Sequence, residues 1–221
     1  MNQAKEIANL LLDLKAVGVR TNPPYTWSSG QKRPMYCDNR LVISYPKERK
    51  IIVDALTALI KEKNLEFDVV GGTASAAVPW ASFIAYALDK PMVYIKKASK
   101  GYGTDKLIEG TMQQGARILI VEDLISTGGS SLRAAEACQK EFGAKVTAVV
   151  AIFTYEMKEA LEAFTMSNIP LYTLSNFHAL IDVAEEKNYI RPEEIQEIRQ
   201  WSEDPTDWDK KYNNSVKFSE N

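Results

Sequence analysis

The sequence predicts an α/β fold: a doubly wound, mainly parallel five-stranded sheet with flanking helices and a small N-terminal hood. Short apolar runs, of the length expected for strands buried on both faces, alternate with longer stretches of helical periodicity. This alternation is typical of parallel sheets, whose crossover connections usually carry a helix. With 221 residues, 45% of them hydrophobic and 25% charged, the chain is composed like a soluble globular protein with a sizeable core. The composition excludes disordered and collagen-like chains.

The elements follow in order along the chain. Ile7, Leu10, Leu11 and Leu14 have the spacing of an amphipathic helix, and the charges among them argue against a signal peptide. Residues 21–40, rich in proline, glycine and aromatic residues, predict short extended pieces, which we call the hood. The expected helices are 46–63, 75–88, 130–142, 156–167, 176–187 and 192–201; the expected strands are 67–70, 92–95, 117–121, 146–153 and 171–174. We therefore divide the chain into an N-terminal helix and hood (1–45), a core (46–208) and a polar tail (209–221).

Charge and rare residues exclude several function classes. Lys and Arg number 27 against 29 Asp and Glu, so the net charge of −2 gives no global attraction to nucleic acid or to anionic membranes. The longest uncharged stretch, 69–88, contains glycines and a proline, which favours strand, turn and helix over a membrane span. Cys37 and Cys138 are far apart, which suits a reducing, cytoplasmic compartment and no zinc ribbon. His178 is the only histidine, so a histidine-rich metal site is excluded.

The strongest motif is EDLISTGGS at 122–130, directly after a buried strand. The glycine- and hydroxyl-rich turn leads into a helix whose first N–H groups lack backbone partners, which favours a bound phosphate. The adjacent carboxylates Glu122 and Asp123 can accept hydrogen bonds from the vicinal hydroxyls of a ribose. The turn could instead be an ordinary helix cap and the acids a solvated pair. The combination, in register after a strand, predicts a ribose with its 5-phosphate a few residues further on.

Two other loops follow predicted strands. The small residues at 71–75 expose backbone N–H groups that could bind a phosphate, or they could allow close packing of strand against helix. The basic segment 96–106 could be a solvated surface or a cationic lid over an anionic leaving group.

These motifs, together with three others, resemble the orotate phosphoribosyltransferase family, one of the type I phosphoribosyltransferases. The matching segments are TWSSG at 26–30, PMYCDNR at 34–40, GTAS at 72–75, IEG at 108–110 and EDLISTGGS at 122–130. They occur in the family's order, and the resemblance covers the chain to about Trp208. It implies a pentosyltransferase that transfers a 5-phosphoribosyl group from phosphoribosyl pyrophosphate (PRPP) to orotate in pyrimidine (UMP) biosynthesis.

The resemblance also implies roles for particular residues. Lys100, Asp123 and Glu122 are expected to be catalytic, with Lys100 on a loop that closes over the active site of the neighbouring subunit in a homodimer. The residues expected to bind PRPP are Gly72, Thr73, Ala74, Ser75, Lys96, Lys97, Lys100, Tyr102, Glu122, Asp123, Leu124, Ile125, Ser126, Thr127, Gly128, Gly129 and Ser130. Those expected to bind orotate are Ser126, Lys32, Tyr36, Cys37 and Arg40. Mg²⁺ is expected to bind mainly through PRPP, with no metal site made by the protein alone.

Three positions depart from the family pattern. Lys96 stands where an arginine is usual, Tyr102 where a histidine is usual, and Trp80 where related sequences often carry histidine. An ammonium cannot make the bidentate phosphate contact of a guanidinium. Two alternatives stay open: a phosphoribosyltransferase for another base, because the segment 122–130 specifies PRPP only, and a non-catalytic PRPP-binding regulator, which these departures support.

Overall fold

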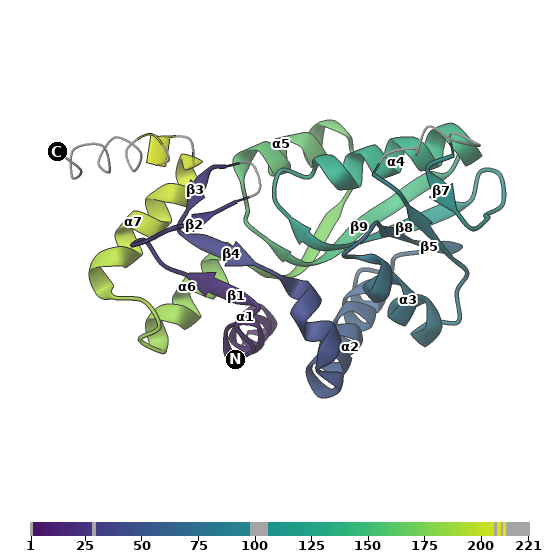
Figure 1. Ribbon diagram of the computed structural model, residues 1–221. Coiled ribbons are helices and arrows are strands. Elements are labelled where there is room, and N and C mark those ends of the chain that lie inside the picture. Colours follow the sequence, from purple (N-terminus) through teal and green to yellow (C-terminus); the bar gives the residue numbers. More distant parts are fainter. Residues whose placement is uncertain (1, 28–29, 98–105, 206, 209, 211–221) are drawn as a thin grey trace.

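The computed structural model describes residues 2–27, 30–97, 106–205, 207, 208 and 210. Its centre is a six-stranded sheet of order β10-β9-β8-β5-β6-β7 (Figure 1). The strands are β5 (Val69–Thr73), β6 (Met92–Ile95), β7 (Ile108–Glu109), β8 (Arg117–Ile125), β9 (Lys145–Thr154) and β10 (Leu171–Asn176). All five predicted strands are present, and they pair in parallel. The prediction missed β7, which pairs antiparallel with β6 at the sheet edge, because two residues are too few to show a pattern.

Both faces of the sheet are buried, as the continuous apolar runs predicted. Along β8, Ile118 and Ile120 face one core, and Leu119 and Val121 face the other. In Figure 1, α4 (Gly129–Phe142) and α5 (Lys158–Met166) lie above the sheet, and α2 (Pro46–Glu62) and α3 (Val78–Ala87) lie below it. The sheet is therefore doubly wound, and its ligand-binding edge is where the strands end and the helices begin.

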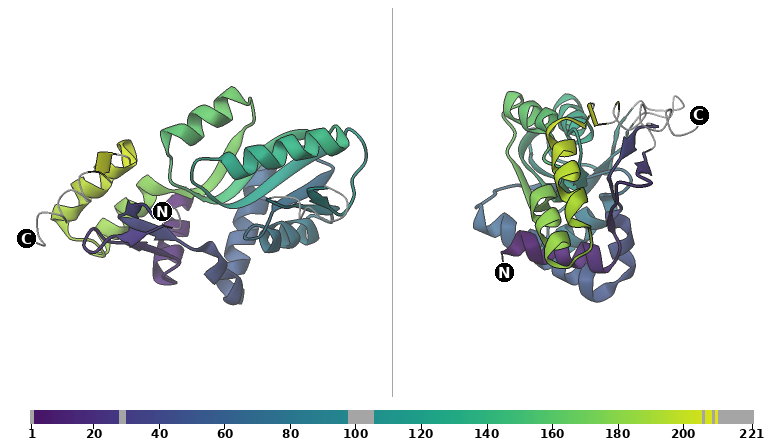
Figure 2. Two further views of the ribbon diagram at one scale, coloured as in Figure 1. Left: turned by 45° about the horizontal axis from the view of Figure 1, so that its top comes forward. Right: turned by 90° about the vertical axis from the view of Figure 1, so that its left-hand side faces the viewer.

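The hood lies beside the core rather than inside it. Strand β1 (Val17–Val19) pairs antiparallel with β4 (Met35–Cys37), and β2 (Tyr25–Thr26) pairs antiparallel with β3 (Lys32–Arg33). The 3-10 helix η1 (Asn39–Ser44) then leads into α2. Figures 1 and 2 show the hood next to the helix α7 (Pro192–Glu203).

Helices and aromatic side chains join the hood to the core. Helix α1 (Gln3–Asp13) packs on α6 (Phe177–Glu186) and β10. Trp27 of the hood stacks on Tyr155 after β9 at 5.3 Å between ring centroids, and both rings meet the edge or face of Trp201 in α7. Trp27 therefore anchors the packing of the hood on the core.

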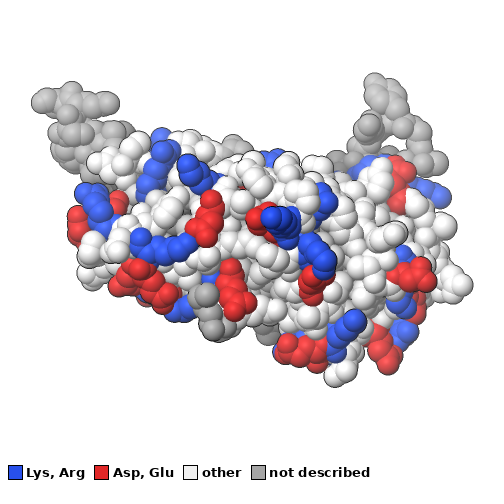
Figure 3. All heavy atoms as spheres, turned by 90° about the horizontal axis from the view of Figure 1, so that it is seen from below, with Lys and Arg blue, Asp and Glu red and all other residues white. Residues whose placement is uncertain are grey.

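The surface carries mixed charge. On the face seen in Figure 3, acidic and basic side chains are interspersed rather than grouped by sign. In the part of the chain that the structure describes, no helix has both the length and the hydrophobicity needed to cross a bilayer.

Candidate functional site

The two acids lie near the carboxyl end of β8, where the predicted motif placed them. Glu122 is buried, and its Oε1 accepts hydrogen bonds from Ser130 Oγ at 2.8 Å and Ser131 Oγ at 3.2 Å. Burial raises the pKa of Glu122, while these hydroxyls oppose the shift by stabilising the charged form. Glu122 therefore holds the first turn of α4 against the strand.

Asp123 has a different environment from its neighbour. Burial, followed by the negative charge of Glu122, raises the pKa of Asp123 to about 7. Its backbone carbonyl accepts a hydrogen bond from Asn39 Nδ2 at 2.5 Å. The cation of Arg40 acts in the opposite sense on the pKa of Asp123. A carboxyl with such a pKa gains strongly from partners that stabilise its charged form, such as the hydroxyls of a bound sugar.

The predicted phosphate turn is formed as expected. Gly128 caps α4 with a φ of 78°, and a Cβ at this position would lie 2.8 Å from the Phe164 ring. Glycine is therefore required twice over, by the backbone conformation and by the close approach of α5. Helix α4 begins at Gly129, and the half-buried Ser126 and exposed Thr127 line the approach to its first turn. Unpaired N–H groups at a helix start form a site for a phosphate.

The loop after β5 contains both of the features that its sequence allowed. A Cβ on Gly72 would lie 2.8 Å from Ala81 Cβ in α3, so this glycine serves close packing. The Ala74 N–H donates to Ile95 O and is already used. Among the described residues, the N–H groups of Ser75 and Ala76 donate to no backbone carbonyl. The donors open to an anion are therefore those of Ser75 and Ala76, and Ala76 was not among the predicted residues.

A cavity of about 230 Å³ connects this loop to α4. Lys96, Lys97 and Arg133 contribute cations to its lining, and Thr73 and Ser130 also reach it. Lys96 is paired with Glu109 of β7 at 2.8 Å. Lys100 and Tyr102, predicted for the same side, lie outside the described residues.

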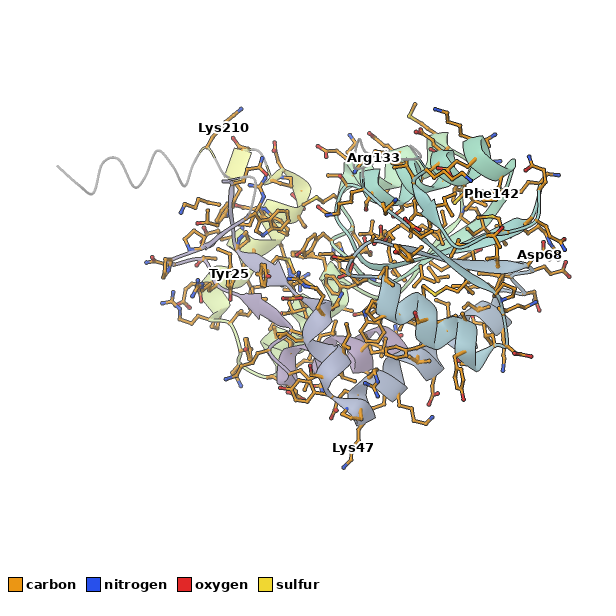
Figure 4. The ribbon with its side chains drawn as sticks, turned by 45° about the vertical axis from the view of Figure 1, so that its right-hand side comes forward. Tyr25, Lys47, Asp68, Arg133, Phe142 and Lys210 are labelled. Carbon is orange, nitrogen blue, oxygen red and sulfur yellow. The ribbon has the colours of Figure 1, made fainter. Side chains whose placement is uncertain are left out.

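Arg133 is a cation that the sequence reading did not single out. It lies near the start of α4 (Figure 4), and its Nη1 would be 3.1 Å from a Cβ built on Gly129. It makes no hydrogen bond or ion pair within the described ranges. Arg133 lies one helical turn after Gly129, so it is on the same face of α4 as the phosphate turn. This spacing could have identified it from the sequence.

A second cavity, of about 400 Å³, lies between the hood and the phosphate turn. Its lining includes Trp27 and Arg33 from the hood, Ser126 and Thr127 from the turn, and Pro205 after α7. The buried Arg33 donates from Nη1 to Lys32 O at 2.9 Å and to Pro205 O at 3.2 Å. Arg33 was missed because it lies between the matching segments 26–30 and 34–40, where no motif marks it.

The residues expected to bind orotate are spread around the hood. Lys32 Nζ donates to Thr26 Oγ1 at 2.8 Å, across the β2–β3 hairpin. Tyr36 is exposed, whereas Cys37 is buried. Arg40 makes a bidentate pair with Asp38, at 2.6 and 2.8 Å. Of the residues expected to bind orotate, only Ser126 lines the cavity between the hood and the turn, to which β3 contributes Arg33.

Comparisons with known proteins agree with this architecture. A family model described as the phosphoribosyl transferase domain matches residues 43–186. The orotate phosphoribosyltransferase of Enterococcus faecalis is 47% identical over 207 residues, covering 94% of this chain and 98% of the relative. That of Staphylococcus aureus is 49% identical over 198 residues, covering 90% and 97%.

The chain belongs to the orotate phosphoribosyltransferase family. Solved structures of other members have the same fold. The Mycobacterium tuberculosis orotate phosphoribosyltransferase in complex with PRPP superposes with a TM-score of 0.62 at 28% identity, over 80% of this chain and 98% of that one. The Aeropyrum pernix enzyme, at 23% identity, gives a TM-score of 0.72 over 84% and 99% of the two chains and supports the fold.

Trp80, one of the three positions that depart from the expected pattern, has a packing role in the structure. Trp80 is fully buried in α3 and meets the edge of Phe83, with ring centroids 6.1 Å apart. Its Nε1 has no hydrogen-bond partner among the described residues. The indole therefore fills the core.

Proposed function

We propose that the protein is an orotate phosphoribosyltransferase. It transfers the 5-phosphoribosyl group of PRPP to N1 of orotate, which gives orotidine 5-phosphate and pyrophosphate in pyrimidine biosynthesis. One observation carries the proposal: the buried Glu122 and the half-buried Asp123 lie just before an open helix start, in a chain 47% identical to an orotate phosphoribosyltransferase along almost its whole length. This arrangement matches a ribose that carries a 5-phosphate.

The donor binds at the edge of the sheet. The Asp123 carboxylate accepts hydrogen bonds from the ribose hydroxyls, while Glu122 fixes α4 through Ser130 and Ser131. The turn from Leu124 to Ser130 holds the 5-phosphate with its N–H groups and hydroxyls. Because both acids are anionic when the donor is bound, they favour the positive charge that develops on the ribose as its C1–oxygen bond breaks.

The leaving group lies on the other side of the acids. The bond electrons of C1–oxygen go to pyrophosphate, whose charge is stabilised by the N–H groups of Ser75 and Ala76 and by the cations Lys96 and Lys97. Lys100 and Tyr102 complete this side in our proposal. The N1 of orotate forms the new bond to C1, and the N1 proton is taken up by the departing pyrophosphate. Exclusion of water matters because water is a competing nucleophile.

Orotate enters beneath the hood. Ser126, Lys32 and the backbone near Tyr36 and Cys37 face the pyrimidine, and Arg40 supplies positive charge for the orotate carboxylate. Charged hydrogen bonds of this kind are stronger than neutral ones and orient a planar ligand. Of these residues, Ser126 lines the cavity of about 400 Å³ between the hood and the turn, which has room for a pyrimidine.

Mg²⁺ is expected to enter the site bound to PRPP. No group of three or more His, Cys, Asp or Glu side chains that could hold a metal occurs among the described residues. We propose that Mg²⁺ enters with PRPP and is held mainly by it, and Asp123 is the protein residue that would help to hold it. Bound there, Mg²⁺ would neutralise charge on the leaving group. We further propose a cytoplasmic homodimer, in which the basic loop reaches the neighbouring site.

The test is a spectrophotometric assay of orotate consumption with PRPP and Mg²⁺. Uracil, hypoxanthine and adenine serve as competing acceptors, with pyrophosphate release as the common readout. We expect pyrophosphate release with orotate as the acceptor and none with the other three bases. Turnover with a purine instead would assign a different base, and tight PRPP binding without turnover of any base would indicate a regulator.

A further inference from the structure

The hood ends in a polar side chain that lies in the protein interior. Asn39 follows β4 and begins η1, and it is 0% exposed. Its Nδ2 donates to the backbone carbonyl of Asp123 at 2.5 Å, and its Oδ1 accepts a weaker hydrogen bond from the Cys37 thiol at 3.4 Å. A buried carboxamide with partners on both sides is held in one orientation. Asn39 is thus a fixed link between the hood and the acid pair.

The position of Asp123 in the sheet explains why this link matters. The pairing of β8 with β5 ends at the pair Gly72 and Val121. Beyond that pair, β8 continues without β5 at its side, and the Asp123 carbonyl takes a hydrogen bond from a residue 84 positions earlier. The hood and Asp123 are also electrostatic neighbours: after burial, the charge of Asp123 is the next cause of the raised pKa of Cys37.

We propose that Asn39 is a positioning residue, which holds the Asp123 backbone so that its carboxylate meets the ribose hydroxyls. This inference rests on the proposed function, because it assumes that Asp123 binds a ribose. Without the Asn39 donor, the Asp123 carbonyl would be left without its partner in the interior, and the end of β8 would shift to reach another donor. Hydrogen bonds weaken steeply with misalignment, so a small shift of this backbone would weaken contacts to the sugar hydroxyls.

The test compares two sugar phosphates that differ by one hydroxyl. Ribose 5-phosphate and 2-deoxyribose 5-phosphate share the phosphate and differ only at C2, so the ratio of their dissociation constants reports the diol contact alone. In the wild type we expect ribose 5-phosphate to bind about 10-fold more tightly or better, as for a hydrogen bond to a charged group. In Asn39→Ala the ratio should fall to about 3-fold or less, with the affinity for 2-deoxyribose 5-phosphate unchanged. Isothermal titration calorimetry measures both.

A matched control separates positioning from general loosening of the fold. Asn176 caps α6, and its Oδ1 accepts a hydrogen bond from the Ala179 N–H at 2.8 Å. Asn176→Ala therefore removes an asparagine with one side-chain–backbone hydrogen bond, away from the acids, and should keep the wild-type ratio. If Asn39→Ala does not fold, Asn39→Leu keeps the approximate size and shape of the side chain but has no donor, and the same fall in ratio is expected.

The outcomes are distinguishable. A wild type that binds both sugar phosphates equally would remove the ribose assignment, and with it the proposed function of Asp123. A wild type that prefers ribose, with the preference kept in both Asn39 variants, would overturn the positioning role alone. Equal weakening of both ligands in Asn39→Ala would likewise overturn it, because that result describes a purely structural residue.

Discussion

Asp123→Asn should raise the free energy of unfolding at alkaline pH and lower the affinity of the protein for ribose. The pKa of Asp123 is raised from 3.8 to about 7, mainly by burial and then by Glu122. The folded state therefore holds this proton more tightly than the unfolded state does. The stability that protonated Asp123 contributes is fully present below pH 3.8 and is lost as the pH rises towards 7. Above pH 7 this contribution no longer changes. Asparagine is uncharged like the protonated acid, so the variant does not lose stability as the pH rises.

The magnitude follows from the size of the pKa shift. A rise of about 3 pH units at about 1.36 kcal/mol per unit gives an upper bound of ~4 kcal/mol above pH 7. For a chain of this length, 1 kcal/mol corresponds to about 2–4 °C in Tm, so the variant should melt at a higher temperature at pH 8, by at most roughly 8 to 16 °C. At pH 4 the two proteins should melt at nearly the same temperature.

The assay is thermal unfolding followed by circular dichroism from pH 4 to pH 8. Asp89→Asn is the matched control, because Asp89 is exposed and its φ of 50° suits asparagine. The control makes the same charge change without burial and should not show the pH-dependent difference. The reasoning fails if Asp123→Asn melts at or below the wild-type temperature at pH 8, or if its advantage is the same at pH 4.

Three further predictions concern the loops and the hood. Lys100→Ala should lower kcat about 100- to 1000-fold with little change in Tm, as for loss of one charge-stabilising donor; near-normal steady-state rates would remove Lys100 from the mechanism. Gly128→Ala should destabilise the protein by more than ~1 kcal/mol in urea unfolding, because of its positive φ and the Phe164 ring 2.8 Å away. Gly115→Ala, at a φ of 75° with no atom within 4 Å of the new Cβ, should cost less, and equal losses would show that the contact is unimportant. Arg40→Ala should raise KM for orotate about 10-fold and leave KM for PRPP unchanged; an unchanged KM for orotate would reassign its carboxylate.

The core of the fold was predictable because its signals are local. Strands buried on both faces give continuous apolar runs, so β8 and β9 were identified along most of their lengths. The helix after β5 begins at Val78 rather than near Ser75, because residues 75–77 form the loop that carries open N–H groups. The hood strands are two or three residues long, and their pairing depends on contacts that no periodicity records.

The site was predictable where one continuous segment makes it. The acids and the phosphate turn lie within nine consecutive residues, so the sequence alone shows that they adjoin one another. The contact between Asn39 and Asp123 joins residues 84 positions apart, and the hydrogen bonds between Glu122 and the two serines depend on how α4 packs. Arg133 likewise reaches the turn only because of the direction of its side chain. Such features need the tertiary structure.

The most direct test of the central claim is a crystal structure of the protein with orotidine 5-phosphate. We expect the ribose hydroxyls within hydrogen-bonding distance of the Asp123 carboxylate, and the 5-phosphate against the N–H groups at the start of α4. A nucleotide whose phosphate lies elsewhere, or whose sugar makes no contact with Asp123, would contradict the account.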